Sequence, residues 1–223
     1  MKTPSARAKI SGFTLIELLV VICLIAIFAA VLSPARFRPK PDRATMIHCL
    51  SNQRQITICM LMWKDDNGGR FPWQASPTNN ETIEFSNLDY PAQVFDAISN
   101  YAHEPRVFVC PTDVTKTAAT NQTQLHNQNT SYFLELDAGT NQAVSILTGD
   151  RHLQTNHKPV KPGLFVYSNN LEMGWTRELH GKVQTAPIGV ACFLDGHGET
   201  IRGINLNSIF QRQGSITNRL AVP

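Results

Sequence analysis

The chain lacks the residue patterns of several common functional classes. It has no CxxC pair and no two histidines at the i, i+4 spacing of a HExxH site, which argues against a structural zinc site or a zincin. It has no basic stripe of the kind that binds nucleic acid, so no nucleic-acid partner is predicted. The formal net charge of +3 equals the charge of Lys2, Arg7 and Lys9 in a leader that contains no acid.

Charge is also nearly absent from the run that follows this leader. Residues 13–33 contain Glu17 as their only charged residue, in the sequence FTLIELLVVICLIAIFAAVLS. A bilayer core of about 30 Å needs about 20 mostly apolar helical residues to cross it. We therefore expect a transmembrane helix over residues 13–33 behind a basic leader over residues 1–12. A secretory signal peptide is the alternative, because small residues up to Ser33 imitate its cleavage site, but its apolar region is normally shorter.

Glu17 is the unusual residue of this run. A carboxylate inside an apolar span costs about 2.5–3.5 kcal/mol on insertion scales, which makes it a functional candidate. The plainer alternative is that Glu17 lies near the start of the helix, where the helix dipole and nearby water stabilise the charge. Both alternatives remain open from these considerations alone.

The residues around Glu17 favour a functional role. Gly-Phe-Thr-Leu-Ile-Glu, from Gly12 to Glu17 behind a basic leader, resembles the processing signal of the type IV pilin and type II secretion pseudopilin superfamily. The resemblance implies that a prepilin peptidase cuts between Gly12 and Phe13, that Phe13 is then N-methylated, and that Glu17 docks one subunit onto the next. Cleavage would expose a cationic amine on Phe13 about one helical turn from Glu17. In a bundle of such helices, the amine of one chain can neutralise the carboxylate of its neighbour.

The resemblance also implies where the chain lies and what it meets. It implies a single-pass inner-membrane protein whose C-terminal domain is in the periplasm or at the cell surface, with prepilin peptidase and other pilin or pseudopilin subunits as partners. The positive-inside rule does not support this orientation, because Arg36, Arg38, Lys40 and Arg43 follow the apolar run. With the reverse orientation, the domain would be cytoplasmic.

Three prolines follow the apolar run, from Pro34 to Pro41. Proline inside a helix removes a hydrogen bond and clashes with the preceding turn, so we expect a kink or break between Pro34 and Pro41. A kinked continuation of the N-terminal helix then covers residues 34–66. Its second segment is predicted from Asp42 to about Asp66, where an Asn-Gly-Gly sequence ends it.

The rest of the chain, residues 67–223, is predicted to be an extracytoplasmic domain. The preceding helix carries an apolar stripe that includes Cys49, Ile56 and Met60, and we expect this stripe to cover a sheet. A helix followed by antiparallel strands defines the α+β class, with a long N-terminal hydrophobic helix packed on a C-terminal sheet, as in pilins. Strands are predicted over 131–136, 143–148, 164–167, 189–194 and 198–202, short helices over 91–100 and 206–212, a surface loop over 114–130, and a hairpin at Asp195-Gly196.

Parts of this domain resemble a subgroup of pilin-like secretion proteins. The matching elements are Asp66-Asn67-Gly68-Gly69-Arg70-Phe71-Pro72, Cys110-Pro111-Thr112-Asp113, Asp195-Gly196 and the final Thr217-Asn218-Arg219-Leu220-Ala221-Val222-Pro223. Relatives of this kind carry a histidine nine residues ahead of the Asp-Gly pair. Here fourteen residues separate His180 from Asp195, so no role is carried over to His180.

Five cysteines are present, and Cys23 lies within the apolar run. The other four would face an oxidising compartment in the expected orientation, where disulfides form. We favour a disulfide between Cys49 and Cys110, although sequence does not fix the connectivity.

No catalytic or metal site stands out. A nucleophile and its base could come from four residues, His180, Cys192, Asp195 and His197. However, Cys192 lies in an apolar strand and no oxyanion glycine motif precedes it. We therefore expect no enzyme activity, no metal ligands and no cofactor. Calcium is the one alternative, because some members of the superfamily bind it through loop oxygens. Such a site could include Asp65, Asp66 and Asn67. Solvation of a helix end explains these polar residues more simply.

These observations predict a membrane-anchored, pilin-like structural subunit. The system expected first is a type II secretion pseudopilus, in which a growing filament drives protein export. The alternatives are a minor type IV pilin used for adhesion or DNA uptake, and a surface binding module anchored by a pilin-type signal.

Overall fold

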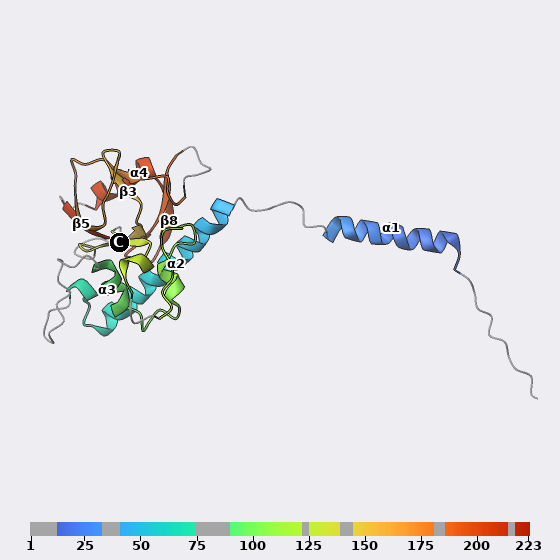
Figure 1. Ribbon diagram of the computed structural model, residues 1–223, viewed down its shortest axis with the longest axis horizontal. Coiled ribbons are helices and arrows are strands. Elements are labelled where there is room, and N and C mark those ends of the chain that lie inside the picture. The colour runs from blue at the N-terminus through green and yellow to red at the C-terminus, as the bar shows by residue number, and fades with distance from the viewer. Residues whose placement is uncertain are drawn as a thin grey trace, which may run out of the picture. The chain divides into compact units, whose positions relative to one another are not determined.

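The computed structural model forms two units, which are described separately: Met1–Pro39 and Lys40–Pro223 (Figure 1). The structure describes residues 13–32, 41–74, 90–121, 125–138, 145–180, 186–213 and 217–223.

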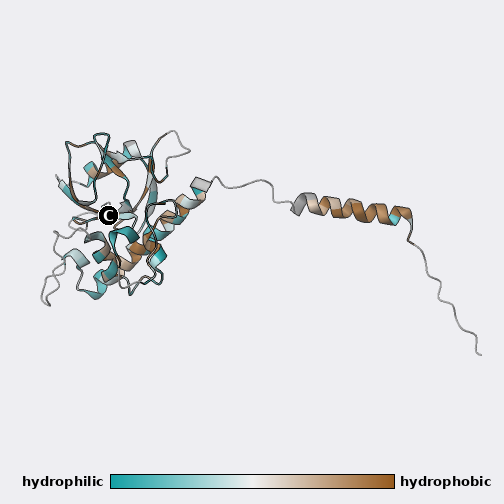
Figure 2. Cartoon of the chain, viewed as in Figure 1, coloured by the Kyte–Doolittle hydropathy of each residue, from teal (hydrophilic) through white to brown (hydrophobic). Residues whose placement is uncertain are grey.

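The described part of the first unit is the helix α1, Leu15–Leu32. Apolar residues occupy almost all of α1, and Figure 2 shows it coloured as hydrophobic along nearly its whole described length. Within the described residues, no helix combines the length and the apolar character needed to cross a membrane. The transmembrane helix predicted over residues 13–33 is therefore not confirmed. The predicted kink before Pro41 lies outside the described residues.

The second unit begins with the helix α2, Pro41–Asp66, close to the predicted bounds. Proline suits the first helical position, because its missing N–H would have no partner there. The helix ends where the side-chain amide of Asn67 donates to the carbonyl oxygen of Trp63 at 2.7 Å. Gly68 and Gly69 follow with φ of +66° and +79°, a conformation that glycine adopts without steric cost.

A six-stranded sheet forms the centre of this unit, and all its neighbouring strands are antiparallel. In spatial order the strands are β5 (Gly163–Ser168), β9 (Thr217–Val222), β1 (Tyr132–Glu135), β2 (Ile146–Asp150), β7 (Ile188–Phe193) and β8 (Gly198–Arg202). The hairpin predicted at Asp195-Gly196 is confirmed, because it joins β7 to β8, and Gly196 has a φ of +86°.

The central strands are buried on both faces, because each face carries its own hydrophobic core. In β1, Tyr132 and Leu134 belong to one core and Phe133 to the other, as the two-residue repeat of a strand requires. The first core lies under α2 and α3 (Tyr90–Ala97), and its α2 residues include Cys49, Ile56 and Met60. The predicted contact between the apolar stripe and the sheet is thus confirmed.

The second core is covered by a small sheet and a helix. The small sheet has the order β4 (Lys158–Pro159), β3 (Leu153–Thr155) and β6 (Met173–Trp175), and the helix α4 is Gly203–Arg212. Leu206 and Phe210 of α4 are fully buried in this core, together with Trp175. The domain therefore has three layers, with the six-stranded sheet in the middle (Figure 1).

Several elements were not predicted from the sequence. β9 runs between β5 and β1, and the three strands of the small sheet are only two or three residues long. The segment predicted as a surface loop is in part anchored to the domain: Leu125 and Thr130 are buried. Short 3-10 helices occur at η1 (Pro72–Gln74), η2 (Pro105–Phe108) and η3 (Asn127–Asn129).

Candidate functional site

Thr14 and Glu17 form a hydrogen-bonded cap at the start of α1. The carboxylate of Glu17 accepts hydrogen bonds from the backbone N–H of Thr14 at 2.9 Å and from its hydroxyl at 2.7 Å. The backbone N–H of Glu17 in turn donates to the Thr14 hydroxyl oxygen at 3.4 Å. This reciprocal pattern is a capping box, which satisfies N–H groups that have no partner inside the helix.

The cap gives Glu17 a local partner, Thr14, which was not predicted from the sequence. The Thr-x-x-Glu spacing ahead of an apolar run was the available signal. Both residues lie after the predicted cleavage point, so the cap would persist in a processed chain. Phe13, the predicted new N-terminus, is 77% exposed, and Gly12 lies outside the described residues.

The described side chains of α1, up to Ala29, are exposed. Large apolar residues along the helix are between 44% and 82% exposed, which is unusual for so many on one element. A helix that is apolar all round needs an apolar environment, either lipid or other helices. The exposed residues are Leu15, Ile16, Leu18, Leu19, Val20, Val21, Ile22, Leu24, Ile25, Ile27 and Phe28.

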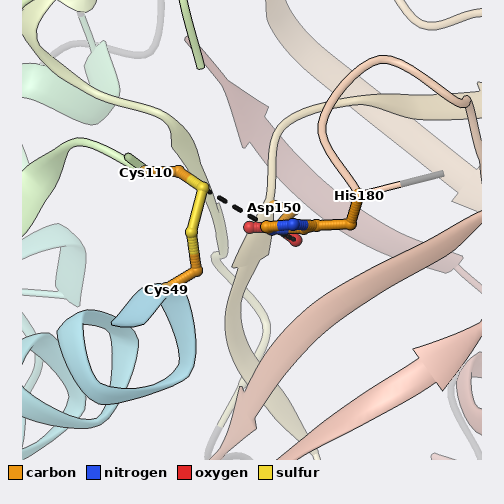
Figure 3. Close-up of side chains that lie close together, drawn as sticks. All are labelled: Cys49, Cys110, Asp150 and His180. Atoms are coloured by element: carbon orange, nitrogen blue, oxygen red, sulfur yellow. Dashed lines mark hydrogen bonds and ion pairs between the residues drawn. A yellow bond between two sulfur atoms is a disulfide. The ribbon is translucent and has the colours of Figure 1, made fainter. Parts of the chain in front are cut away.

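The second unit contains a buried cluster of two cysteines, one aspartate and one histidine. Cys49 and Cys110 form a disulfide, which is the pair that the sequence favoured. His180 lies against it, with its Nε2 3.5 Å from Cys110 Sγ and 3.4 Å from Asp150 Oδ2 (Figure 3). All four residues are at most 1% exposed. No local sequence pattern predicts this cluster, because its members come from four distant segments.

Hydrogen bonds from two neighbouring elements fix Asp150 within this cluster. Its Oδ1 accepts from the side-chain amide of Gln53 at 3.0 Å, and its Oδ2 accepts from the backbone N–H of Val190 at 2.7 Å. Burial raises the pKa of Asp150 to about 8, although both hydrogen bonds favour the charged form. Burial also lowers the pKa of the neighbouring His152 to about 3, with the nearby His180 acting in the same direction, so His152 is neutral at physiological pH.

The Cys-Pro-Thr-Asp element ends in a second polar site next to the disulfide. Asp113 accepts two hydrogen bonds from the guanidinium of Arg151, at 2.7 and 3.0 Å, and one from the hydroxyl of Ser131 at 2.9 Å. Burial alone would raise the pKa of Asp113, but these hydrogen bonds and one from Thr115 hold it below its usual value. Asp113 therefore anchors the segment after Cys110 to Ser131, just before β1, and to Arg151, just after β2.

The four residues that could form a nucleophile and its base have different environments. Cys192 is fully buried in β7, where burial raises the pKa of its thiol to about 12. Asp195 and His197 lie on the exposed hairpin and pair with each other. The contacts of His180 described above are with Asp150 and Cys110 instead.

Two of the three residues that could contribute to a calcium site, Asp66 and Asn67, have protein partners. Asp66 accepts a hydrogen bond from the hydroxyl of Tyr101 at 2.8 Å, and Asn67 caps the end of α2 as described. These contacts give both side chains a role within the domain.

Comparison with known proteins identifies the N-terminal segment. Residues 7–33 match the family described as the prokaryotic N-terminal methylation motif. No curated protein and no solved structure matches the chain. The chain therefore carries a type IV pilin-like signal at its N-terminus, and this signal contains Gly12, Phe13 and Glu17.

Proposed function

We propose that this protein is a membrane-anchored, pilin-like structural subunit of a type II secretion pseudopilus, and that it is not an enzyme. The match of residues 7–33 to the methylation motif is the observation that carries the proposal. The segment is processed by prepilin peptidase between Gly12 and Phe13, and Phe13 becomes the methylated N-terminus. The mature protein remains in the inner membrane with its domain in the periplasm.

Assembly follows from the chemistry of the mature N-terminus. The exposed apolar side chains of α1 pack against lipid and against the helices of neighbouring subunits. Glu17 of one subunit pairs with the Phe13 amine of the next. The domain contributes a rigid body held by the Cys49–Cys110 disulfide.

The processing step is tested by mass spectrometry of the mature protein from its native host. We expect an N-terminus at Phe13 with one added methyl group. A mature protein that begins at Met1 or Lys2, or after Ser33, would refute the proposal, the last by indicating a secretory signal peptide.

The docking role is tested with three variants of α1. Glu17→Ala should be inserted and cleaved but excluded from filaments. Thr14→Ala also breaks the capping box and keeps the carboxylate, so it should assemble. Leu18→Ala controls for truncation of an exposed neighbour. Equal assembly defects in Glu17→Ala and Thr14→Ala would assign the defect to the cap and contradict docking.

The secretion role is separated from the pilus alternative by deleting the gene. In the proposed role, the deletion abolishes export of secreted enzymes and leaves surface pili intact. Loss of pili, adhesion or DNA uptake with normal export would instead assign the chain to a type IV pilus as a minor subunit.

A further inference from the structure

The buried cluster brings together four residues whose side chains are common metal ligands. One potential ligand atom from each of Cys49, Cys110, Asp150 and His180 lies within 4.8 Å of all the others. The residues come from α2, the segment after η2, the end of β2 and the segment after β6. Figure 3 shows the imidazole and the carboxylate side by side, next to the disulfide.

The two distances from His180 Nε2 to its neighbours in the cluster fit tetrahedral coordination. Zinc bonds of about 2.0–2.2 Å to nitrogen and oxygen and about 2.3 Å to sulfur place tetrahedral ligand atoms about 3.4 Å (N to O) and about 3.6 Å (N to S) apart. The corresponding distances are 3.4 Å from His180 Nε2 to Asp150 Oδ2 and 3.5 Å from His180 Nε2 to Cys110 Sγ. The two sulfur atoms, which are bonded to each other at 2.00 Å, must move apart for both to bind the same ion.

The surroundings of the carboxylate resemble those of a supported metal ligand. Ligating carboxylates are usually held by further hydrogen bonds from the protein, and these bonds fix their orientation. Gln53 and the backbone N–H of Val190 hold Asp150 in this way. All four residues are buried, so a bound ion would be screened from water.

We propose that the reduced protein binds one zinc-class divalent cation through Cys49, Cys110, Asp150 and His180, and that the disulfide is the oxidised, metal-free state of the same site. Thiolate and imidazole ligands favour zinc over magnesium or calcium. A dithiol reductant supplies two electrons and two protons, which convert the disulfide to two thiols. Metal binding then releases one proton from each thiol, and His180 ligates through a neutral Nε2. Oxidation by a disulfide exchange catalyst removes two electrons from the thiolates, reforms the S–S bond and releases the cation.

Cobalt(II) titration of the full chain in detergent tests this site, because a cobalt–thiolate site absorbs in the near ultraviolet and a tetrahedral one has intense visible bands. The protein is first reduced with a phosphine under anaerobic conditions. We expect these bands to saturate at one equivalent of cobalt, to disappear when zinc is added, and to be absent from the oxidised protein.

Variants assign the signal to its ligands. Cys49→Ser/Cys110→Ser should abolish the charge-transfer band, and His180→Gln should lose the tetrahedral spectrum. His197→Gln, at an exposed histidine, should keep it. Tryptophan fluorescence reports whether each variant folds. If a variant fails to fold, the comparison of the reduced and the oxidised wild type still tests the site. No thiolate band in the reduced wild type, or the same band in the double serine variant, would overturn the proposal and leave a purely structural disulfide.

Discussion

The side-chain amide of Gln53 on α2 donates to Asp150 Oδ1 on β2 at 3.0 Å and to the carbonyl oxygen of Val190 on β7 at 3.2 Å. One buried side chain thus joins the helix to two strands of the central sheet. It lies in the same stripe as Cys49, Ile56 and Met60, where a purely apolar residue would satisfy helix packing alone.

Replacing Gln53 by leucine should therefore destabilise the domain. Gln53→Leu removes the donor and leaves a buried carboxyl group and a buried carbonyl short of a partner, at a cost of about 1–3 kcal/mol. Denaturant unfolding followed by tryptophan fluorescence measures this cost, because the three tryptophans, Trp63, Trp73 and Trp175, all lie in the second unit. Gln55→Leu, at an exposed position two residues away, is the control and should change stability little. Equal losses in both variants would contradict the role given to Gln53.

Removing the disulfide should lower stability more strongly. Cys49 and Cys110 are 61 residues apart in sequence, and a cross-link over such a loop is worth about 4 kcal/mol in the chain-entropy model. We expect a loss of this order in Cys49→Ser/Cys110→Ser, measured by denaturant unfolding in the presence of a metal chelator. Reduction should lower the unfolding free energy of the wild type to near that of the variant and leave the value for the variant unchanged. If reduction does not change the stability of the wild type, the result would argue against the disulfide.

Glu135 should make stability depend on pH. Its side chain is buried beside Asn218, which donates to it, and burial raises the pKa of Glu135 from its ordinary 4.5 to about 8. Between these values the folded state keeps a proton that the unfolded state releases. The contribution of Glu135 to stability therefore falls as pH rises through this window, by at most about 1.4 kcal/mol per pH unit.

The variant Glu135→Gln isolates this contribution from that of Asp150, whose pKa is raised in the same direction. Unfolding free energies measured from pH 5 to pH 8 should decline less steeply in Glu135→Gln than in the wild type. Glu199→Gln, at an exposed position on β8, should follow the wild-type profile. Parallel profiles for all three proteins would contradict the prediction.

Gly189 should tolerate no side chain, because Trp175 packs directly on it. A Cβ at Gly189 would lie 2.4 Å from Trp175 Cδ2, and Trp175 is fully buried. We expect Gly189→Ala to cost about 3 kcal/mol through overpacking. Gly174→Ala in β6 is the control, since its nearest contact would be an ordinary 3.5 Å. Thermal unfolding distinguishes them, and a stable Gly189→Ala would show that the indole can move aside.

The outcome of the sequence predictions depended on whether the signal was local. The bounds of α2, the α3 helix, the hairpin at Asp195-Gly196 and several central strands follow from periodicity and turn residues within a few positions. β9 was missed because its sequence, TNRLAV, is half polar: Asn218 points inward, where Glu135 pairs with it. The burial of a polar residue beside a partner that is distant in sequence cannot be predicted from the residues around it.

By itself, the sequence determined the N-terminal signal, the apolar character of α1 and the position of Glu17, because each depends on residues within one short segment. The tertiary structure alone decided the partners of His180. Cys49, Cys110, Asp150 and His180 meet only when α2 packs across the sheet and the segments after η2 and β6 reach the end of β2. No spacing rule encodes such a meeting, because the distances are set by the packing of layers and not by the chain between them.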